Sequence, residues 1–323
     1  MARKRGTVGV IGLGNMGGAF ARNLAASGWR VIGFDPLPAK RRAAAKAGVE
    51  LAASAADVAR QVRDVLVSLP GPKALDAVTR EIVAAKLPPR IVIETSTFTV
   101  ADKERAEKVL RKAGHVMLDC TVSGTGAQAA VRDLIFYASG DTGTIRRLRP
   151  MFRSFGREVY DLGVFGNGSK MKYVANLLVA IHNVAAAEAM VLGIKAGLDP
   201  HMVYELANAG AGQNRMFEVR GPMMVRSQYT PATMKNALWK KDMDVIGAFA
   251  EEIGIKVPVF RATEPVYRAA IKDHPDEDTA AVCAVLERMG KVKRSKPARG
   301  RKSPKKSARK STRRKRRAKP ARR

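Results

Sequence analysis

The stretch Thr-Val-Gly-Val-Ile-Gly-Leu-Gly-Asn-Met-Gly at residues 7–17 decides the fold of this chain. Its first five residues are mostly β-branched, as in a buried strand, and the glycines Gly12, Gly14 and Gly17 follow immediately. Residues 16–27 then have the apolar spacing of a helix, which Gly28 ends. The stretch therefore predicts a strand, a tight glycine turn and a helix in direct succession.

Short β-rich runs alternate with helix-like stretches from this point to about residue 161. The runs lie at residues 7–11, 30–34, 64–69, 90–94, 115–119, 134–139 and 157–161, and helical patterning fills segments such as 102–113. This alternation predicts an α/β fold, a doubly wound and mostly parallel sheet of the Rossmann type. We expect this domain to occupy residues 1–165.

Only helical patterns continue beyond residue 168. They lie at residues 170–196, 200–209, 231–253, 258–271 and 278–289 and predict an all-α domain over residues 166–290. The longest apolar run, residues 174–194, is interrupted by four polar residues and is predicted to be a buried helix rather than a membrane span. The apolar stretch near residue 10 is short and broken by glycines, so we expect no export signal.

Charge is distributed unevenly along the chain. The sequence has 59 Lys and Arg against 29 Asp and Glu, a net charge of +30. Residues 291–323 hold 19 Lys or Arg and no acidic residue, so 40 basic and 29 acidic residues, a net charge of +11, remain for residues 1–290. The composition predicts a disordered tail whose charge favours nucleic acid or another polyanion as a partner. A solubilising or acidic-membrane-seeking extension without a dedicated partner stays open as the alternative.

The cysteines and histidines indicate neither a disulfide framework nor a metal centre. Cys120 and Cys283 lie far apart, and the four histidines have no metal spacing and no nucleophile beside them. We therefore expect a cytoplasmic protein without a bound metal, associated with the nucleoid if the tail binds nucleic acid.

The glycine turn predicts a dinucleotide site. Gly12 permits the tight turn, Gly14 lets the backbone approach a pyrophosphate, and Gly17 lets the helix pack on the strand. Asp35 ends the next strand, 18 residues beyond Gly17, where a carboxylate accepts hydrogen bonds from the ribose diol and disfavours a 2′-phosphate. This favours NAD, but the basic residues 40–42 leave NADP open. The expected contacts of the turn are Gly12, Leu13, Gly14, Asn15, Met16 and Gly17.

Six motifs resemble those of one enzyme family. The sequence GLGNMGGAFARNL at residues 12–24 is similar to the opening motif of the β-hydroxyacid dehydrogenases, which include 3-hydroxyisobutyrate dehydrogenase and tartronate semialdehyde reductase. The others follow in order as LPGP at 69–72, ETSTFTV at 94–100, DCTVSGTGA at 119–127, GNGSKMKYVAN at 166–176 and KKDMDV at 240–245. Together they cover about residues 7–290.

By this resemblance Lys172 is the catalytic lysine, and the chemistry agrees. A hydroxyl whose carbon loses a hydride must also lose its proton, and a lysine can accept it if burial lowers the pKa of its ammonium. Asn176 lies four residues on, so both side chains project from one helix face toward the reacting oxygen. Lys170 is a competing candidate near the same glycines, but the spacing to Asn176 favours Lys172.

The resemblance also implies where substrate and cofactor are held. Ser123, Gly124 and Thr125 follow a strand end, where small residues expose amides and a hydroxyl to the carboxylate of a small acid. Lys241 is expected to close over cofactor and substrate, and Asp242 to hold the local structure. The other cofactor contacts that the resemblance implies are Leu69, Pro70 and Thr97.

Four positions depart from the family pattern and leave the specific acid undetermined. They are Val100, Thr121, Thr125 and Ala175. We expect an NAD(P)-dependent oxidoreductase that interconverts a small β-hydroxy acid and its 3-oxo acid or semialdehyde, as a homodimer or homotetramer. The alternatives are a nucleic-acid-associated protein with a dehydrogenase-like scaffold, or an imine reductase or 6-phosphogluconate dehydrogenase on the same architecture.

Overall fold

The structure, a computed structural model, describes residues 5–294. Within this part the chain forms one compact unit that ends at Val292, so the domain boundary near residue 165 stays a prediction. The predicted disordered tail at residues 291–323 lies outside the described residues, except for its first four.

One sheet organises the first half of the chain, in the order β3-β2-β1-β4-β5-β6-β7-β8. All neighbouring strands are parallel except β6 and β7, which confirms the mostly parallel sheet. The two-residue strand β3 was not predicted, because it is too short to show a hydrophobic period. The strands are β1 (Thr7–Ile11), β2 (Arg30–Phe34), β3 (Glu50–Leu51), β4 (Asp64–Val67), β5 (Ile91–Glu94), β6 (Val116–Ser123), β7 (Ile135–Ser139) and β8 (Glu158–Asp161).

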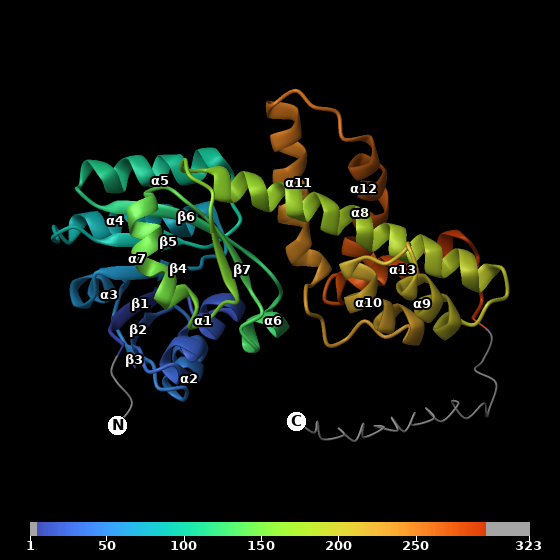
Figure 1. The fold of residues 1–323 in the computed structure, drawn as a ribbon, viewed down its shortest axis with the longest axis horizontal. Coiled ribbons are helices and arrows are strands. Elements are labelled where there is room, and N and C mark those ends of the chain that lie inside the picture. Colours follow the sequence, from blue (N-terminus) through green and yellow to red (C-terminus); the bar gives the residue numbers. More distant parts are fainter. Residues whose placement is uncertain (1–4, 295–323) are drawn as a thin grey trace, which may run out of the picture. The chain divides into compact units, whose positions relative to one another are not determined.

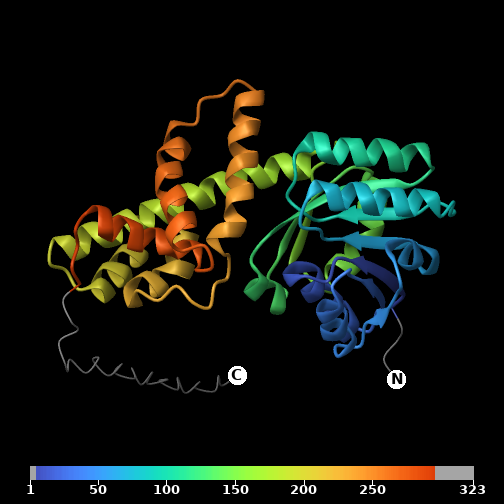
Figure 2. The same cartoon turned by 180° about the vertical axis from the view of Figure 1, so that it is seen from behind.

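Helices cover both faces of this sheet, as Figures 1 and 2 show from opposite sides. One apolar cluster joins α1 and α7 to one face, and a second joins α3, α4 and α5 to the other, so the sheet is doubly wound as predicted. The helices are α1 (Asn15–Ala26), α2 (Pro38–Ala45), α3 (Ala55–Gln61), α4 (Pro72–Ala84), α5 (Val100–Lys112), α6 (Gly126–Ala130) and α7 (Thr142–Phe152).

The strand order reverses between β1 and β4. The chain runs from β1 outward to β3 and then returns to the other side of β1. In open α/β sheets the crevice at such a reversal, beyond the carboxyl ends of the strands, is where ligands bind. The loops that leave β1 and β4 start at this crevice, and they begin with Gly12 and Ser68.

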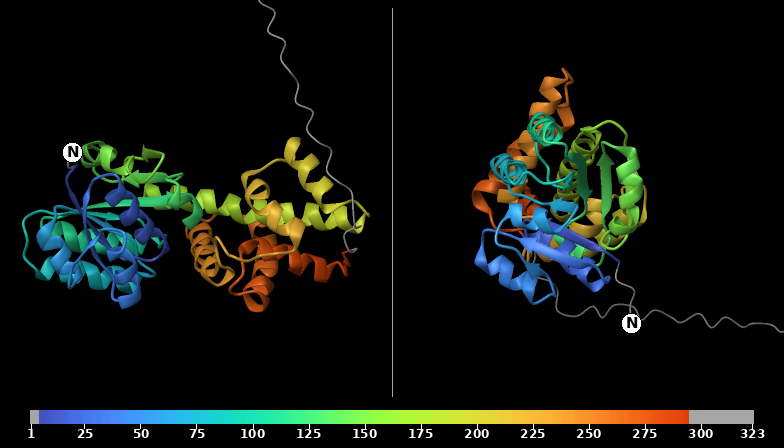
Figure 3. Two further views of the ribbon diagram at one scale, coloured as in Figure 1. Left: turned by 90° about the horizontal axis from the view of Figure 1, so that it is seen from below. Right: turned by 90° about the vertical axis from the view of Figure 1, so that its left-hand side faces the viewer.

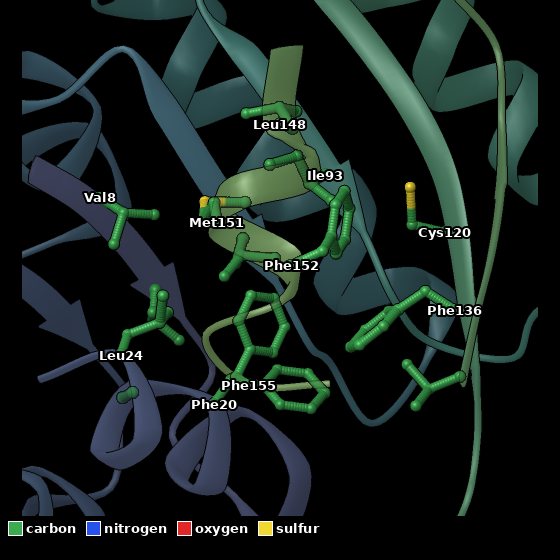
Figure 4. Packing of buried hydrophobic residues seen from close by; sticks show 14 of the residues in the cluster. Val8, Phe20, Leu24, Ile93, Cys120, Phe136, Leu148, Met151, Phe152 and Phe155 are labelled. Atoms are coloured by element: carbon green, nitrogen blue, oxygen red, sulfur yellow. The ribbon is translucent and has the colours of Figure 1, made fainter. Parts of the chain in front are cut away.

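Four phenylalanines hold α1 firmly against the sheet (Figure 4). The ring centroids of Phe20 and Phe155 are 5.2 Å apart, and Phe136 lies 5.0 Å from Phe152 and 5.1 Å from Phe155. These rings come from α1, β7, the last residue of α7 and the segment that follows it, and all are essentially buried. The helix that follows the glycine turn is therefore fixed by packing as well as by the turn.

The second half is helical, as predicted, and the long helix α8 leads into it from the sheet (Figure 3). Near its start α8 packs against β6 and β7, and farther along it packs against α9 to α13. The helices are α8 (Asn167–Lys195), α9 (Pro200–Ala209), α10 (Arg215–Arg226), α11 (Asn236–Glu252), α12 (Pro258–Asp273), the short 3₁₀ helix η1 (Thr279–Ala281) and α13 (Val282–Met289).

Two parts of the helical half differ most from the sequence prediction. The helix expected from residue 231 begins at Asn236, because the preceding segment binds Asp278, whose carboxylate accepts hydrogen bonds from the Thr233 and Met234 amides. Helix α10 was not predicted, since it contains Gly221 and Pro222, which usually break helices.

Helix α8 is buried on only part of its surface. Val174, Leu178 and Leu192 are 51%, 46% and 73% exposed, so the prediction of a buried helix holds for one face. By length and composition α8 could cross a membrane, and 39% of its most apolar window is buried. This is weak evidence for a membrane span, because a core helix of a soluble protein satisfies the same test.

Candidate active site

The glycine turn after β1 has the geometry that a bound pyrophosphate needs. A Cβ on Gly12 would lie 2.0 Å from the Ser68 carbonyl oxygen, and one on Gly17 would lie 1.9 Å from the Gly12 carbonyl oxygen. A Cβ on Gly14 would meet nothing within 4 Å. Gly12 and Gly17 are therefore required by close packing, while Gly14 borders open space at the start of α1, where the amides of a helix N-terminus can bind an anion.

Asp35 lies next to this turn and is 7% exposed. Its Oδ2 accepts a hydrogen bond of 2.8 Å from the Leu13 amide, and its Oδ1 accepts one of 2.9 Å from the Leu37 amide. Each oxygen keeps a second lone pair that a ribose hydroxyl can use. Arg41 donates to the Asp35 carbonyl oxygen at 2.8 Å, which places a guanidinium beside the same position. The turn and Asp35 together fit an adenine dinucleotide.

The loops that follow β4 and β5 are tied to each other. The Leu69 amide donates to Ser96 Oγ at 2.8 Å, and the Ser96 amide donates to Glu94 Oε1 at 2.8 Å. These bonds bring the predicted cofactor contacts Leu69 and Thr97 onto one edge of the crevice. Ser96 and Glu94 were not singled out from the sequence.

Lys172 and Asn176 lie one turn apart in the first part of α8. Asn176 is buried and Lys172 is partly buried, whereas the competing Lys170 is exposed. Dehydration lowers the pKa of Lys172 to about 8; the carboxylate of Asp242 opposes this shift and the ammonium of Lys241 adds to it. A lysine with this pKa can both hold and release a proton near neutral pH.

Helix α11 brings Lys241 to the loop after β5. Lys241 Nζ donates to the Thr97 carbonyl oxygen at 2.6 Å and lies 5.6 Å from the centroid of the Phe98 ring. Asp242 is mostly buried, and its Oδ1 is 3.5 Å from Lys241 Nζ. The structure thus brings the predicted closing lysine together with Thr97, and places Asp242 within electrostatic range of Lys172.

The predicted substrate loop lies at the end of β6. Gly124 has φ of +134°, and a Cβ there would come within 2.5 Å of Leu134, so the position requires glycine. The Thr125 amide donates to Gln128 Oε1 at 3.0 Å and is engaged at the start of α6. Among the described residues, no hydrogen bond joins this loop directly to Lys172.

A buried ion cluster joins α5 to β5 and β6, and it was not predicted from the sequence. Lys103 Nζ lies 2.6 Å from Glu94 Oε2 and 2.7 Å from Asp119 Oδ1, and all three side chains are inaccessible to water. Burial alone lowers the pKa of Lys103, but the charges of Asp119 and Glu94 outweigh it and hold that pKa above its ordinary value. Burial raises the pKa of Glu94. The available signal was an acidic residue at the end of each of two apolar strands.

The cysteines and His115 are accounted for by packing. Cys120 and Cys283 are buried thiols, and His115 Nδ1 accepts a hydrogen bond from the Arg90 amide. Within residues 5–294 no group of three His, Cys, Asp or Glu is arranged to hold a metal ion.

Comparisons with known proteins cover both halves of the chain. Residues 7–163 match a family model described as the NAD binding domain of 6-phosphogluconate dehydrogenase, and residues 166–286 match one described as NAD-binding of NADP-dependent 3-hydroxyisobutyrate dehydrogenase. A probable 3-hydroxyisobutyrate dehydrogenase of Mycobacterium tuberculosis is 29% identical over 286 residues, or 87% of this chain and 97% of the relative.

Two further similarities agree with these. An L-threonate dehydrogenase of Cupriavidus necator is 31% identical over 284 residues, or 86% of this chain and 95% of the relative. The solved structure of the Mycobacterium tuberculosis 3-hydroxyisobutyrate dehydrogenase with L-serine has a TM-score of 0.80 at 28% identity, covering 87% of this chain and 98% of that one.

Proposed function

Since this chain belongs to the β-hydroxyacid dehydrogenase family and is an NAD(P)-dependent enzyme, we propose that it interconverts a small β-hydroxy acid and its 3-oxo acid or semialdehyde. The observation that carries this proposal is the pair Lys172 and Asn176 on one face of α8, with the pKa of Lys172 lowered to about 8.

In the oxidation direction Lys172 acts as a general base. Its neutral amine accepts the hydroxyl proton of the substrate, while Asn176 holds the reacting oxygen through its carboxamide. The nicotinamide, when bound, supplies the group that accepts the hydride from the substrate carbon. In the reduction direction the Lys172 ammonium returns the proton to the developing alkoxide.

The loop after β6 orients the substrate through its carboxylate. The Ser123 hydroxyl and the backbone at Gly124 are the groups that we assign to it, with Thr125 beside them. A fixed carboxylate determines which carbon faces the nicotinamide, because a small acid has few other polar groups. Lys241 excludes water by closing against Thr97, and its contact with the Thr97 carbonyl oxygen supports this role.

For the cofactor we propose residues 12–17, Asp35, Leu69, Pro70 and Thr97 as the binding groups. Asp35 favours NAD, since a carboxylate beside the ribose diol repels a 2′-phosphate. Arg41, which is bonded to the Asp35 carbonyl oxygen, supplies the charge that tolerates NADP.

The test is a panel of small acids, including 3-hydroxyisobutyrate, L-serine, L-threonate and succinic semialdehyde, assayed with both cofactors. These acids are chosen because the names of relatives include them. We expect turnover of at least one acid, loss of turnover in Lys172→Ala, and retention in Lys170→Ala, which changes an exposed lysine two residues away. Full activity of Lys172→Ala would remove this mechanism.

The alternatives have less support. The retained lysine argues against imine reduction, and relatives named as hydroxyacid dehydrogenases at 28–31% identity argue against a core that is only a scaffold. Imine reductase structures at 16–18% identity share the fold alone.

We also propose that the protein self-associates through α8. The exposed side chains of Val174, Leu178 and Leu192 recur on this helix, and apolar surface of this kind usually faces another subunit. Light scattering should give a dimer or tetramer, and Leu178→Lys should shift it toward the monomer. An unchanged monomeric mass for the wild type would contradict this.

A second activity is proposed for the basic tail alone. Its 19 positive charges over residues 291–323 suit sequence-independent binding to nucleic acid, and composition is the only support. Retention on DNA should weaken steeply with salt and disappear when residues 291–323 are removed. Equal retention of the shortened chain would dismiss the proposal.

A further inference from the structure

Lys103 is a fully buried lysine that the proposed mechanism does not use. It projects from α5 toward the end of β5 and the middle of β6, and its ammonium lies within 2.7 Å of a carboxylate oxygen on each strand. Both carboxylates, Glu94 and Asp119, are inaccessible to water. Burying three ionised groups is costly unless every charge is paired and hydrogen-bonded. The other hydrogen bonds of the two carboxylates therefore show which parts of the chain the cluster fixes.

One set of contacts leads from Asp119 to the first turn of α8. Asp119 Oδ2 accepts a hydrogen bond of 2.7 Å from the Ser169 amide, and Oδ1 accepts one of 3.0 Å from the Ser169 hydroxyl. A carboxylate at this position satisfies an amide that the helix itself leaves unpaired, and it complements the positive end of the helix dipole. Ser169 lies three residues before Lys172, so Asp119 holds the turn from which Lys172 projects.

Neighbouring contacts hold the same turn from the strands. The Gly168 amide donates to Ser139 Oγ at 2.9 Å, and the Thr121 hydroxyl donates to the Gly168 carbonyl oxygen at 2.7 Å. A Cβ on Gly168 would lie 2.4 Å from the Tyr137 carbonyl oxygen and 2.6 Å from that of Asp119. The start of α8 therefore packs closely against β6 and β7, and a side chain at position 168 could not be accommodated there.

The other set of contacts leads from Glu94 to the cofactor side of the crevice. Glu94 Oε1 accepts the Ser96 amide, and Ser96 Oγ accepts the Leu69 amide, both at 2.8 Å. Lys103 thus bridges the Leu69 loop, which we propose binds the cofactor, and the helix that we propose carries the proton acceptor. Lys103 therefore joins a loop and the start of a helix, two segments that must be in register for hydride and proton transfer.

We propose that Lys103 is the positioning residue of this active site, holding Lys172 and the Leu69 loop in register through Asp119, Ser169 and Glu94. The inference rests on the proposed function, because it gives Lys172 the role of proton carrier. Lys103 touches neither substrate nor cofactor in this arrangement and acts through the groups that it binds.

The experiment compares Lys103→Met with Lys108→Met in the full chain. Both changes remove one positive charge from α5, but Lys108 is exposed. Ser169→Ala is the milder second variant, since it deletes the hydroxyl, which bonds Asp119 and also contacts Tyr173, and keeps the amide contact to Asp119. Its control is Ser27→Ala, which deletes one side-chain bond to the Ser154 carbonyl oxygen at the end of α1.

Three readouts separate positioning from general destabilisation. The first is kcat and KM per cofactor-binding site, the second is the pH profile of kcat/KM, and the third is amide hydrogen exchange of residues 164–173 without cofactor, with residues 260–270 as reference. Counting cofactor-binding sites removes the effect of any unfolded fraction. Partial unfolding would change neither the pH profile nor the contrast between the two peptides.

For Lys103→Met we expect kcat to fall about 100-fold with KM changed much less, because a displacement of about 1 Å is enough to cost that factor. In the oxidation direction the rise of kcat/KM with pH, centred near pH 8 in the wild type, should shift to a higher pH by about one unit or more. The reason is that a loosened turn admits water to Lys172 and so raises the pKa of its ammonium. Exchange of residues 164–173 should rise about tenfold while residues 260–270 stay unchanged. Ser169→Ala should show smaller changes in the same directions.

Wild-type kinetics in both Lys103→Met and Ser169→Ala would overturn the proposal, and so would a loss of activity with an unmoved pH limb and unaltered exchange at residues 164–173. If Lys103→Met does not fold, the Ser169→Ala pair decides by the same criteria. If the wild type turns over no acid, the proposed function fails, and hydrogen exchange alone then decides whether Lys103 holds α8.

Discussion

Replacing Lys172 by methionine should stabilise the protein while removing its activity. Lysine and methionine are both unbranched, so the exchange keeps most of the packing and deletes the ammonium. In the folded chain the pKa of Lys172 is about 8, against an ordinary value of 10.5. The folded structure therefore disfavours the charged form, and at neutral pH that form is the one present.

The magnitude follows from the shift. Each pKa unit corresponds to about 1.4 kcal/mol, so the charged Lys172 lowers the free energy of unfolding by about 3 kcal/mol. The sign is fixed by linkage: because the folded pKa is depressed, the unfolded chain binds the extra proton, and stability rises with pH between about 8 and 10.5. The variant should gain about 3 kcal/mol at pH 6, about half of that near pH 9.3, and nothing above pH 10.5.

The assay is urea unfolding of both proteins from pH 6 to pH 9.5, followed by far-ultraviolet circular dichroism. Taking the difference between wild type and variant at each pH cancels the other titrating groups. Lys170→Met is the matched control, since this lysine is exposed and should give a difference close to zero at every pH. A variant less stable than the wild type at pH 6, or a gap that does not change with pH, would refute the reasoning.

Three further outcomes are expected. In the oxidation direction kcat/KM should rise with pH through about 8, and in the reduction direction it should fall above the same pH, because the amine accepts the proton and the ammonium donates it. An oxidation rate that falls, or a reduction rate that rises, through this pH range in the pH–rate profiles would contradict this. Gly17→Ala should lower the Tm, because its Cβ would lie 1.9 Å from a carbonyl oxygen. Gly14→Ala should leave the Tm unchanged and weaken cofactor binding about tenfold or more, which a fluorescence titration with NADH measures. Asp35→Asn should raise the ratio of NADP to NAD use by about tenfold, since it removes the charge that repels a 2′-phosphate while Arg41 remains; an unchanged ratio would place cofactor choice elsewhere.

Local patterns were enough to predict the Rossmann sheet and the helical second half. A strand followed by glycines and a helix has few other solutions, and the strands buried on both faces stand out as apolar runs. The prediction failed where tertiary contacts override local preference. Residues 231–235 are held by Asp278 instead of continuing a helix, and α10 forms in spite of Gly221 and Pro222.

The sequence by itself determined the class of protein, because glycine spacing, the acid after the second strand, and the Lys172 and Asn176 spacing are local and depend on backbone geometry. Only the tertiary structure decided the electrostatic environment of Lys172. Its lowered pKa depends on burial and on Asp242 and Lys241, which lie about 70 residues away in the chain. The cluster of Lys103, Glu94 and Asp119 could not be predicted for the same reason. No periodicity in the sequence indicates that the charged side chains of one helix and two strands contact each other.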